Sequence, residues 1–427
     1  MDAMGDTKLY PRYLLPRLRQ ALADTPALLV HGPRQCGKTT LTRMLGKRYT
    51  YYTFDDRDLL AAVKRDPVGF VERLPARVIL DEVQHVPELF AELKQVIDRQ
   101  RQPGRFVLTG SSNVLLLPRL SDSLAGRMEI LHLYPLAQSE IARQPPRFLE
   151  QAFGGALAAH HGERLGKNMV TRVLNGGFPE PLRRTSAARK RAWYDNYIET
   201  LIQRDIRELS NIQHGAIIPK LLRLLANHTG QLLNISELCK AFQLSRHTVD
   251  AYVALLRQVF LVDFLQPWFT NRNKRLVKTP KVHVMDTGLA CALGQLNQAQ
   301  LEQQPAVFGH VLESFVYSEL RKQASWQSES VAFHYYRDKD QYEVDMVLEN
   351  SAGRFVGIEV KAAASVFDAD FRGLRRLQRQ VSRHFSAGVV LYDGRQVLSF
   401  GDGLFAAPLS VLWAAGEGKT SLRPGEA

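Results

Sequence analysis

The sequence predicts an α/β protein of several domains, and three observations support this fold class. A glycine-containing loop at residues 32–39 lies between an apolar run and a segment with helix-type spacing. Further apolar runs, at residues 78–80 and 106–109, alternate with helix-type segments, which is typical of a parallel sheet with helices on both faces. Toward the C-terminus, a helix-type pattern at residues 310–320 precedes two segments that alternate apolar and polar residues, as strands do.

The composition is that of a folded protein with an anionic partner. The chain has 427 residues, 45% of them hydrophobic, which is enough for about three domains with cores of their own. Its net charge of +13 favours nucleic acid as the partner, with an anionic membrane surface as the second candidate. Residues 1–8 contain no apolar signal segment and no apolar run is long enough to span a bilayer, so we expect a soluble, cytoplasmic protein that does not use a membrane.

The three cysteines lie far apart in the sequence. Cys36, Cys239 and Cys291 have no metal-ligand spacing, so we expect neither a disulfide framework nor a zinc site. Cys36 falls inside the glycine-containing loop, where we interpret it as a small residue that fits; a redox brake is the alternative.

The loop at residues 32–39 matches the phosphate-binding pattern G-x-x-x-x-G-K-[ST]. Its glycines let the backbone N–H groups point at phosphate oxygens, and the helix that follows adds the positive end of its dipole. Lys38 is expected to reach the β- and γ-phosphates of ATP, and Thr39 to bind Mg²⁺. A turn that binds nothing is the alternative, which the flanking strand and helix disfavour. The residues expected to bind the nucleotide are Gly32, Pro33, Arg34, Gln35, Cys36, Gly37, Lys38, Thr39 and Thr40.

Two carboxylates follow the apolar run at residues 78–80. Since they come after the loop and directly after a strand, we expect Asp81 to hold Mg²⁺ and Glu82 to act as the base near the attacking water. A strand at residues 49–54 is expected beside them. The carboxyl ends of parallel strands meet at one edge of the sheet, so these groups should converge with Lys38.

Two further candidates lie beyond the next strands. Residues 110–113 are small and polar, and Asn113 is our choice for sensing the γ-phosphate or orienting water. Arg127 precedes a strand at residues 128–133. It is either an arginine finger that reaches a neighbouring subunit, which implies a homo-oligomer, or a surface salt bridge. Both interpretations stay open.

Together these stretches resemble the AAA-type ATPase module of a large prokaryotic family whose C-terminal half was long labelled a domain of unknown function. The resemblance extends from about residue 20 to residue 400 and implies ATP hydrolysis with Mg²⁺. The stretches that carry it are residues 32–39, 80–84, 109–112, 123–127, 176–180, 204–205 and 281–289.

The middle of the chain is expected to be helical. Residues 137–210 form a lid or connector, and residues 211–280 read as a winged helix in which Ser245 begins the third helix. Arg246 and His247 would meet DNA at the start of that helix, although Asp250 would repel phosphate and such a module also docks proteins. The basic run that supports DNA binding is Arg272, Lys274, Arg275, Lys278 and Lys281. The other expected domains are the ATPase core at 1–136, a nuclease-like domain at 281–415 and a tail at 416–427.

The C-terminal domain resembles the restriction-endonuclease-like fold with its D…E-x-K signature. Asp345 is followed fourteen residues later by Glu359, with Lys361 two positions further on the same strand face. The resemblance implies that Asp345 and Glu359 bind Mg²⁺, that Glu313 contributes from a helix, and that Lys361 orients or deprotonates the attacking water. A stripe of arginines on the next helix could follow a phosphate backbone. These are Arg372, Arg375, Arg376, Arg379 and Arg383.

We therefore expect a cytoplasmic AAA-type ATPase that acts on DNA, with Mg²⁺-dependent phosphodiester cleavage as a second activity. The main alternative is a nucleotide-gated switch that binds DNA or docks a protein partner through the winged helix, with the nuclease-like domain kept as an inactive scaffold. A toxin-like or defence component is a third possibility.

Overall fold

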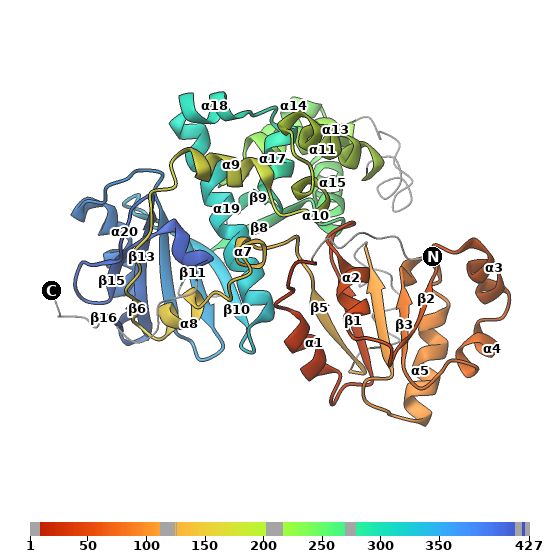
Figure 1. Cartoon of the computed structure of the whole chain (residues 1–427). Helices are drawn as coiled ribbons and strands as arrows, with labels where there is room; N and C mark the ends of the chain where they lie inside the picture. The colour runs from red at the N-terminus through yellow and green to blue at the C-terminus, as the bar shows by residue number, and fades with distance from the viewer. Residues whose placement is uncertain are drawn as a thin grey trace.

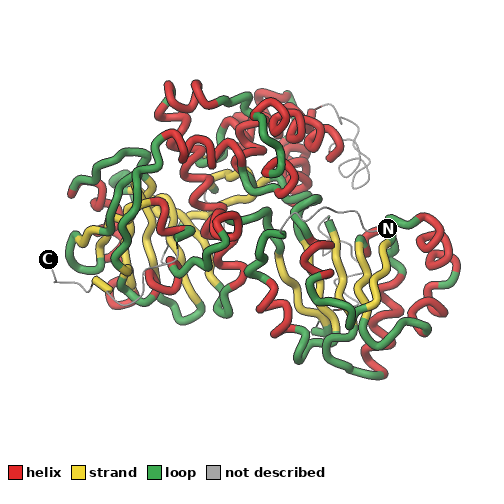
Figure 2. Tube along the Cα trace, in the orientation of Figure 1, coloured by secondary structure: helices red, strands yellow, loops and turns green. Residues whose placement is uncertain are grey.

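The computed structural model describes residues 9–111, 124, 126–201, 217–269, 279–414 and 421–422. Two sheets lie at opposite sides of the molecule, and a group of helices lies above and between them (Figure 1). Figure 2 shows the strands gathered on these two sides. Among the described helices, none combines the length and the apolar character that crossing a membrane requires.

The N-terminal sheet has five parallel strands in the order β2-β3-β4-β1-β5. Because helices cover both of its faces, its inner strands are buried along their whole length and do not alternate with polar residues. The strands that the sequence predicts are confirmed. The elements are α1 (Leu15–Ala21), β1 (Ala27–His31), α2 (Lys38–Arg43), β2 (Thr50–Thr53), α3 (Arg57–Arg65), α4 (Pro67–Glu72), β3 (Val78–Asp81), η1 (Val83–His85), α5 (Leu89–Arg99), β4 (Phe106–Gly110) and β5 (Met128–His132).

Successive residues of β1 point to opposite faces of this sheet. Leu28 packs with Leu18 of α1 and Leu41 of α2, whereas Leu29 packs with Phe90 and Leu93 of α5. Strand β1 is thus an inner strand, held between β4 and β5 and packed on both faces, and its carboxyl end presents the glycine-containing loop at a fixed place.

A helical domain follows. Its core joins aromatic residues of α11 to apolar residues of the helices that come after it, such as Leu222 and Leu256. Trp193 and Tyr197 stack at 4.9 Å between ring centroids, as expected for core residues. The elements from residue 138 to residue 303 are α7 (Gln138–Ala142), α8 (Phe148–Phe153), β6 (Leu157–Ala158), α9 (Lys167–Asn175), α10 (Pro179–Leu182), α11 (Ala187–Leu201), α13 (Ile217–Asn227), β7 (Gln231–Leu232), α14 (Ile235–Phe242), α15 (Arg246–Gln258), β8 (Val262–Pro267), β9 (Lys281–Val284), α17 (Thr287–Leu293) and α18 (Gln298–Gln303).

Helices form on both sides of residues 243–245, as the sequence predicts. Helices α14 and α15 are joined by residues 243–245, and the Ser245 hydroxyl caps α15 by accepting from the Thr248 N–H at 3.2 Å. Arg246 and His247 are exposed at the start of α15. Of the basic run that follows, residues 272, 274, 275 and 278 lie outside the described residues.

The second sheet has nine strands in the order β14-β15-β13-β12-β11-β10-β8-β9-β7. Its strands β7 and β8 come from the segment expected to be a winged helix, β9 begins the segment expected to be nuclease-like and pairs with both, and β8 joins β10 in parallel. Strands on both sides of residue 280 therefore share one sheet. The remaining elements are α19 (Pro305–Trp326), β10 (Val331–Arg337), β11 (Glu343–Asn350), β12 (Phe355–Val360), η4 (Asp368–Phe371), α20 (Arg372–Val381), η5 (Ser382–His384), β13 (Phe385–Tyr392), β14 (Leu398–Ser399), β15 (Leu404–Pro408), η6 (Leu409–Leu412) and β16 (Ser421–Leu422).

Candidate functional site

The loop after β1 is shaped by its glycines. Gly37 takes a left-handed conformation at φ 102°, and helix α2 begins at the next residue. Gly32 lies so close to the backbone that follows β5 that an added Cβ would sit 2.0 Å from the Leu133 carbonyl oxygen. Gln35 also has a positive φ, of 58°. A backbone of this shape can point its N–H groups inward, as phosphate binding requires.

Lys38 is folded back into this loop. Its ammonium donates to the carbonyl oxygens of Gly32 at 3.1 Å and Pro33 at 3.0 Å, and the side chain is buried. These carbonyls hold the charge inside the loop, where a phosphate would take their place as its partner.

The carboxylate of Asp81 accepts hydrogen bonds from three hydroxyl groups. Thr39 donates to it at 2.9 Å and Tyr51 at 2.5 Å, and Thr109 of β4 donates to its other oxygen. Burial and the bond to Asp81 raise the pKa of Tyr51 to about 12. Thr39 and Asp81, each predicted to bind Mg²⁺, thus lie within hydrogen-bond distance of each other. Tyr51 and Thr109 are additions that the sequence did not predict, although they occupy β2 and β4, the two strands that flank β3.

Glu82 follows in a left-handed conformation at φ 59°, which turns its side chain away from the strand. Ser111 donates to its carboxylate at 2.9 Å, and Gln84 donates to the same oxygen. Burial opposes its ionisation, but the Lys38 charge and these hydrogen bonds outweigh burial and lower the pKa of Glu82. The carboxylate is therefore held ionised. Asn113, predicted beside it, lies outside the described residues.

A cavity of about 290 Å³ opens beside the loop. Its walls come from the N-terminal segment, the loop and α2, and the start of the helical domain. The buried Arg12 guanidinium at its edge donates to the Cys36 carbonyl oxygen at 3.3 Å. The residues that define the cavity are Leu9, Tyr10, Arg12, Cys36, Gly37, Thr40, Leu136, Arg143, Pro179 and Arg183. The sequence carries no local signal for this cavity because the three segments that line it are distant in the chain.

Arg127 forms an ion pair within its own chain. Its guanidinium donates to both oxygens of Asp98 on α5, at 2.6 and 2.9 Å. Since Met128 pairs with Ala27 at the start of β1, Arg127 lies at the end of the sheet opposite the phosphate loop. In this structure Arg127 thus has Asp98 as the partner that the salt-bridge interpretation requires.

The predicted nuclease-like residues also come together. Lys361 donates to Glu359 at 3.0 Å, and the backbone N–H of Val360 donates to Asp345 at 2.9 Å. Burial and the Asp345 charge raise the pKa of Glu359 to about 8. Glu313 approaches from α19, as expected. Its carboxylate contacts Lys281 at 3.0 Å rather than the other acids.

Lys281 is the residue that sequence analysis misplaced. It belongs to the basic run expected to face DNA, but it is 3% exposed and lies among carboxylates of the C-terminal domain. Strand β9 carries it into the shared sheet, which buries it.

The arginine stripe on α20 is partly neutralised. Arg375 donates to Asp368, and Arg376 to Asp338 and Asp340, at distances between 2.5 and 2.9 Å. These acids are distant in sequence from α20 or precede it, so the stripe itself gives no sign of the ion pairs. The exposed arginines that remain on or next to this helix are Arg372, Arg379 and Arg383.

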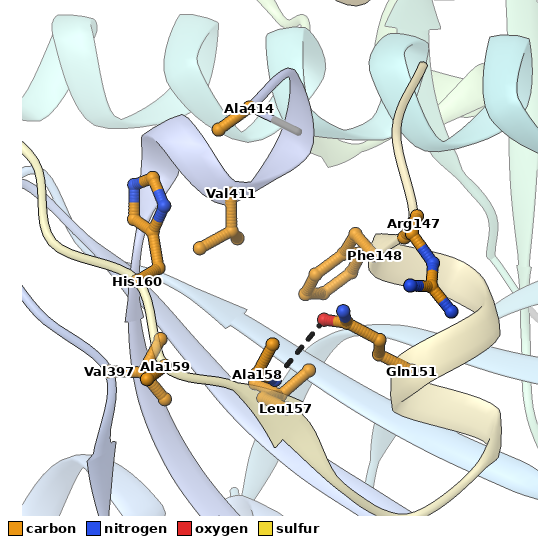
Figure 3. Close-up of a pocket in the computed structure, with 10 residues that line it drawn as sticks. All are labelled: Arg147, Phe148, Gln151, Leu157, Ala158, Ala159, His160, Val397, Val411 and Ala414. Carbon is orange, nitrogen blue, oxygen red and sulfur yellow. Dashed lines mark hydrogen bonds between the residues drawn. The ribbon is translucent and has the colours of Figure 1, made fainter. Parts of the chain in front are cut away.

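One further cavity is too small for a ligand. Figure 3 shows His160, Phe148 and Gln151 around it, and its volume is about 20 Å³, enough for one water molecule. His160 forms a hydrogen bond with Ser410 at 2.8 Å. We assign no binding function to this cavity.

Comparison with known proteins supports the N-terminal assignment. Residues 24–142 match the AAA domain model, and residues 166–300 and 308–412 match two models described as domains of unknown function, DUF8612 and DUF4143. The chain is similar to the Walker-type ATPase PABY2304 of Pyrococcus abyssi, with 16% identity, coverage of 67% of this chain and 96% of that one, and a TM-score of 0.39. It is also similar to a RuvB variant of Thermotoga maritima, with 17% identity, coverage of 62% and 93%, and a TM-score of 0.24.

Two curated relatives match nearly the whole chain. They are the uncharacterized proteins Rv2008c of Mycobacterium tuberculosis and Mb2031c of Mycobacterium bovis, each 31% identical over 402 residues, which cover 94% of this chain and 84% of the relative. The AAA-type module predicted from the N-terminal motifs is confirmed by the domain match, whereas the winged helix and the nuclease-like domain remain predictions. The chain therefore belongs to the family of these mycobacterial proteins, with an AAA-type ATPase domain at residues 24–142.

Proposed function

We propose that this chain hydrolyses ATP and that its nucleotide state controls binding of DNA by the helical and C-terminal domains. The observation that carries the proposal is that the helical domain touches the phosphate loop at two points. The Tyr197 hydroxyl of α11 donates to the Arg34 carbonyl oxygen at 3.2 Å. The His31 ring, directly before the loop, packs edge-on against Phe260 at 5.3 Å between centroids.

The second contact lies where the chain is strained. Phe260 has a φ of 60°, a conformation that costs a bulky side chain of the order of 1–3 kcal/mol and persists only where surroundings enforce it. It stands between α15 and β8, so it links the phosphate loop to the C-terminal end of α15, the helix that carries Arg246 and His247 at its start. A phosphate that draws Lys38 away from Gly32 and Pro33 would alter the loop to which both contacts are made.

The ATPase site supplies the groups for hydrolysis. Oxygen donors suit Mg²⁺, and the adjacent Thr39 hydroxyl and Asp81 carboxylate fit it. Bound there, Mg²⁺ would neutralise phosphate charge. Glu82, held ionised, would accept the proton of the attacking water, and Lys38 would stabilise charge on the γ-phosphate. We place the nucleotide base in the cavity beside Gly37, against Tyr10 and Pro179.

DNA is the partner that the charges favour. The chain carries +13 overall. Arg246 and His247 are exposed at the start of α15, and Arg372, Arg379 and Arg383 at or near α20. Arg246 lies 3.7 Å from Asp250, a pair that water keeps weak because both side chains are more than half exposed. Phosphate contacts from these arginines would make the affinity fall as salt rises.

The test measures the affinity for a fluorescein-labelled DNA duplex by anisotropy, without nucleotide, with ADP and with a slowly hydrolysed ATP analogue. We expect at least about a fivefold difference between nucleotide states, which Lys38→Ala abolishes. Tyr197→Phe should shrink this difference while leaving ATP affinity nearly unchanged. Its matched control is Tyr392→Phe, which loses a similar hydroxyl-to-carbonyl bond to Gln396 in the C-terminal domain. Absence of DNA binding in every state would exclude DNA as the partner.

DNA cleavage is the second candidate, favoured by the meeting of Asp345, Glu359 and Lys361. However, a metal ion does not fit the arrangement as it stands, because Asp345 and Glu359 already have cationic or N–H partners. The direct test offers supercoiled, linear, single-stranded and branched DNA with Mg²⁺ or Mn²⁺ to the wild type and to Asp345→Ala. Cleavage that disappears in the variant would establish this activity.

A further inference from the structure

Lys281 lies at the centre of the carboxylate cluster of the C-terminal domain. Its ammonium is 2.7 Å from Glu343, 3.0 Å from Glu313 and 3.6 Å from Asp345. The acids come from two elements, α19 and β11, and the lysine from a third, β9. The side chain of Lys281 is 4% exposed, so this contact is fixed inside the protein.

The Lys281 ammonium lies among the carboxylates of the cluster, where a shared metal ion would have to bind. A divalent ion would need oxygens at about 2.0–2.6 Å on several sides, and an ammonium that bridges Glu313 and Asp345 stands between two of the three acids expected to bind it. The third, Glu359, is 3.0 Å from Lys361. Within the described residues, no group of three or more acidic, histidine or cysteine side chains is arranged to hold a metal ion.

The local charges keep Lys281 in place. Burial opposes its charged form, but the charges of Glu313, Asp345 and Glu343 together outweigh burial and raise its pKa, so the lysine stays protonated. The side chain also lies 5.7 Å from the centroid of the Tyr335 ring, whose face favours a cation. Removal of the lysine would leave buried acids without a counter-charge, which is strongly unfavourable.

We propose that Lys281 is the built-in counter-cation of this carboxylate cluster and takes the place of a divalent metal ion. In this arrangement the nuclease-like domain holds no metal and serves as a scaffold in the sheet that it shares with β7 and β8. The proposal rests on the contacts of Lys281 and does not depend on the proposed ATPase function.

The test counts Mn²⁺ ions bound to the full chain, by electron paramagnetic resonance in the absence of nucleotide. Wild type and Asp345→Asn should bind the same number, because the cluster holds no metal while Lys281 is present. Lys281→Met should bind one more Mn²⁺ than wild type, and the double variant Lys281→Met/Asp345→Asn should lose it again. Any Mn²⁺ at the ATPase site is common to all four proteins and cancels in these comparisons.

Thermal unfolding gives a second readout. Lys281→Met should have a lower Tm than wild type, and Mn²⁺ should restore it. The matched control is Lys322→Met, which removes another buried lysine, bound to Glu319 at 2.8 Å on the same helix as Glu313. Its Tm should fall without recovery in Mn²⁺.

Two results would overturn the proposal. One is a wild type that binds one Mn²⁺ more than Asp345→Asn, and this comparison holds even when Lys281→Met does not fold. The other is a folded Lys281→Met that gains no Mn²⁺. Neither experiment involves ATP or DNA, so failure here is seen separately from failure of the nucleotide-controlled binding.

Discussion

The carboxylate of Asp286 accepts a hydrogen bond from the backbone N–H of Gly177 at 2.6 Å, although 109 residues separate them. The same carboxylate caps α17 by accepting from the Leu289 N–H at 3.1 Å, and it also accepts from the Tyr194 hydroxyl at 3.0 Å. An added Cβ on Gly176 would lie 2.2 Å from Asp286, so only glycine fits there. The stretches at 176–180 and 281–289 thus meet in one structural junction.

Asp286→Ala should destabilise the helical domain. The change removes the cap of α17 and leaves the buried N–H groups of Gly177 and Leu289 without their side-chain acceptor, at a cost of about 2–4 kcal/mol, whereas the Tyr194 hydroxyl keeps the Asn175 carbonyl oxygen. Urea unfolding followed by tryptophan fluorescence measures it, since Trp193 lies in the same core. Asp250→Ala, on the exposed face of α15, is the control and should change stability by no more than about 0.5 kcal/mol. Equal stability of the two variants would contradict the role of Asp286.

Glu82→Gln should bind ATP but hydrolyse it about 10²–10⁴ times more slowly, because the amide cannot accept the proton of water. Because the pKa of Glu82 is lowered, the loss of ATPase activity caused by protonation of Glu82 should occur below pH 4.5, the ordinary pKa of this group. Steady-state phosphate release and fluorescent-nucleotide binding measure the two effects. Glu88→Gln, exposed at the start of α5, is the control. A Glu82 variant with wild-type kcat would exclude it as the base.

The parts of this molecule that the sequence predicts well are those that depend on neighbouring residues. The strand–loop–helix around Lys38, the carboxylates directly after β3 and the cap at Ser245 each follow from a short stretch of chain. Periodicity also predicts which face of a strand is buried, because alternation acts over a few residues.

The parts that it predicts poorly depend on distant partners. Lys281 ends a basic run, which suggests solvent, yet strand pairing buries it against Glu313. Arg376 meets Asp338, which lies 38 residues away. Local spacing shows which face of an element a side chain occupies but not which group lies opposite that side chain. The sequence pattern therefore does not reveal an ion pair that neutralises a basic stripe, or an ion pair that blocks a metal site.

Cys239 should react with iodoacetamide before the other cysteines in the native protein. It is half-buried, whereas burial raises the pKa of the Cys36 thiol and raises that of Cys291 to about 12. Peptide mass spectrometry after brief alkylation measures the order. Rapid labelling of Cys36 that ATP prevents would instead support the redox-brake interpretation.

His31 should make the protein less stable in acid. Burial, and then the Lys38 charge, lower its pKa from 6.5 to about 4. As pH falls through 6.5 the unfolded chain takes up a proton that folded His31 does not accept until about pH 4, so stability falls with pH across this window, by up to about 3 kcal/mol.

The measurement is urea unfolding of wild type and His31→Phe from pH 7 to pH 4. The variant should lose less stability over this range, because it removes one group that protonates on unfolding. His247→Phe is the control, since it makes the same substitution at an exposed ring far from the loop in sequence. A slope in His31→Phe equal to that of wild type would contradict the assignment.

Arg127→Ala separates the two interpretations of that residue. Its ion pair with Asp98 lies on the surface at the end of the sheet opposite the phosphate loop. If this pair is its only role, the variant should keep the wild-type ATPase rate at every protein concentration, with a Tm close to that of wild type. An arginine finger acting on a neighbouring subunit would instead lose about 10³–10⁵-fold in kcat, and mixing with Lys38→Ala chains would restore part of the activity. Asp98→Ala is the matched control, because it breaks the same ion pair while leaving the arginine available to a neighbour. We expect both variants to behave as wild type, since a pair this exposed is weak and its arginine lies far from its own nucleotide site.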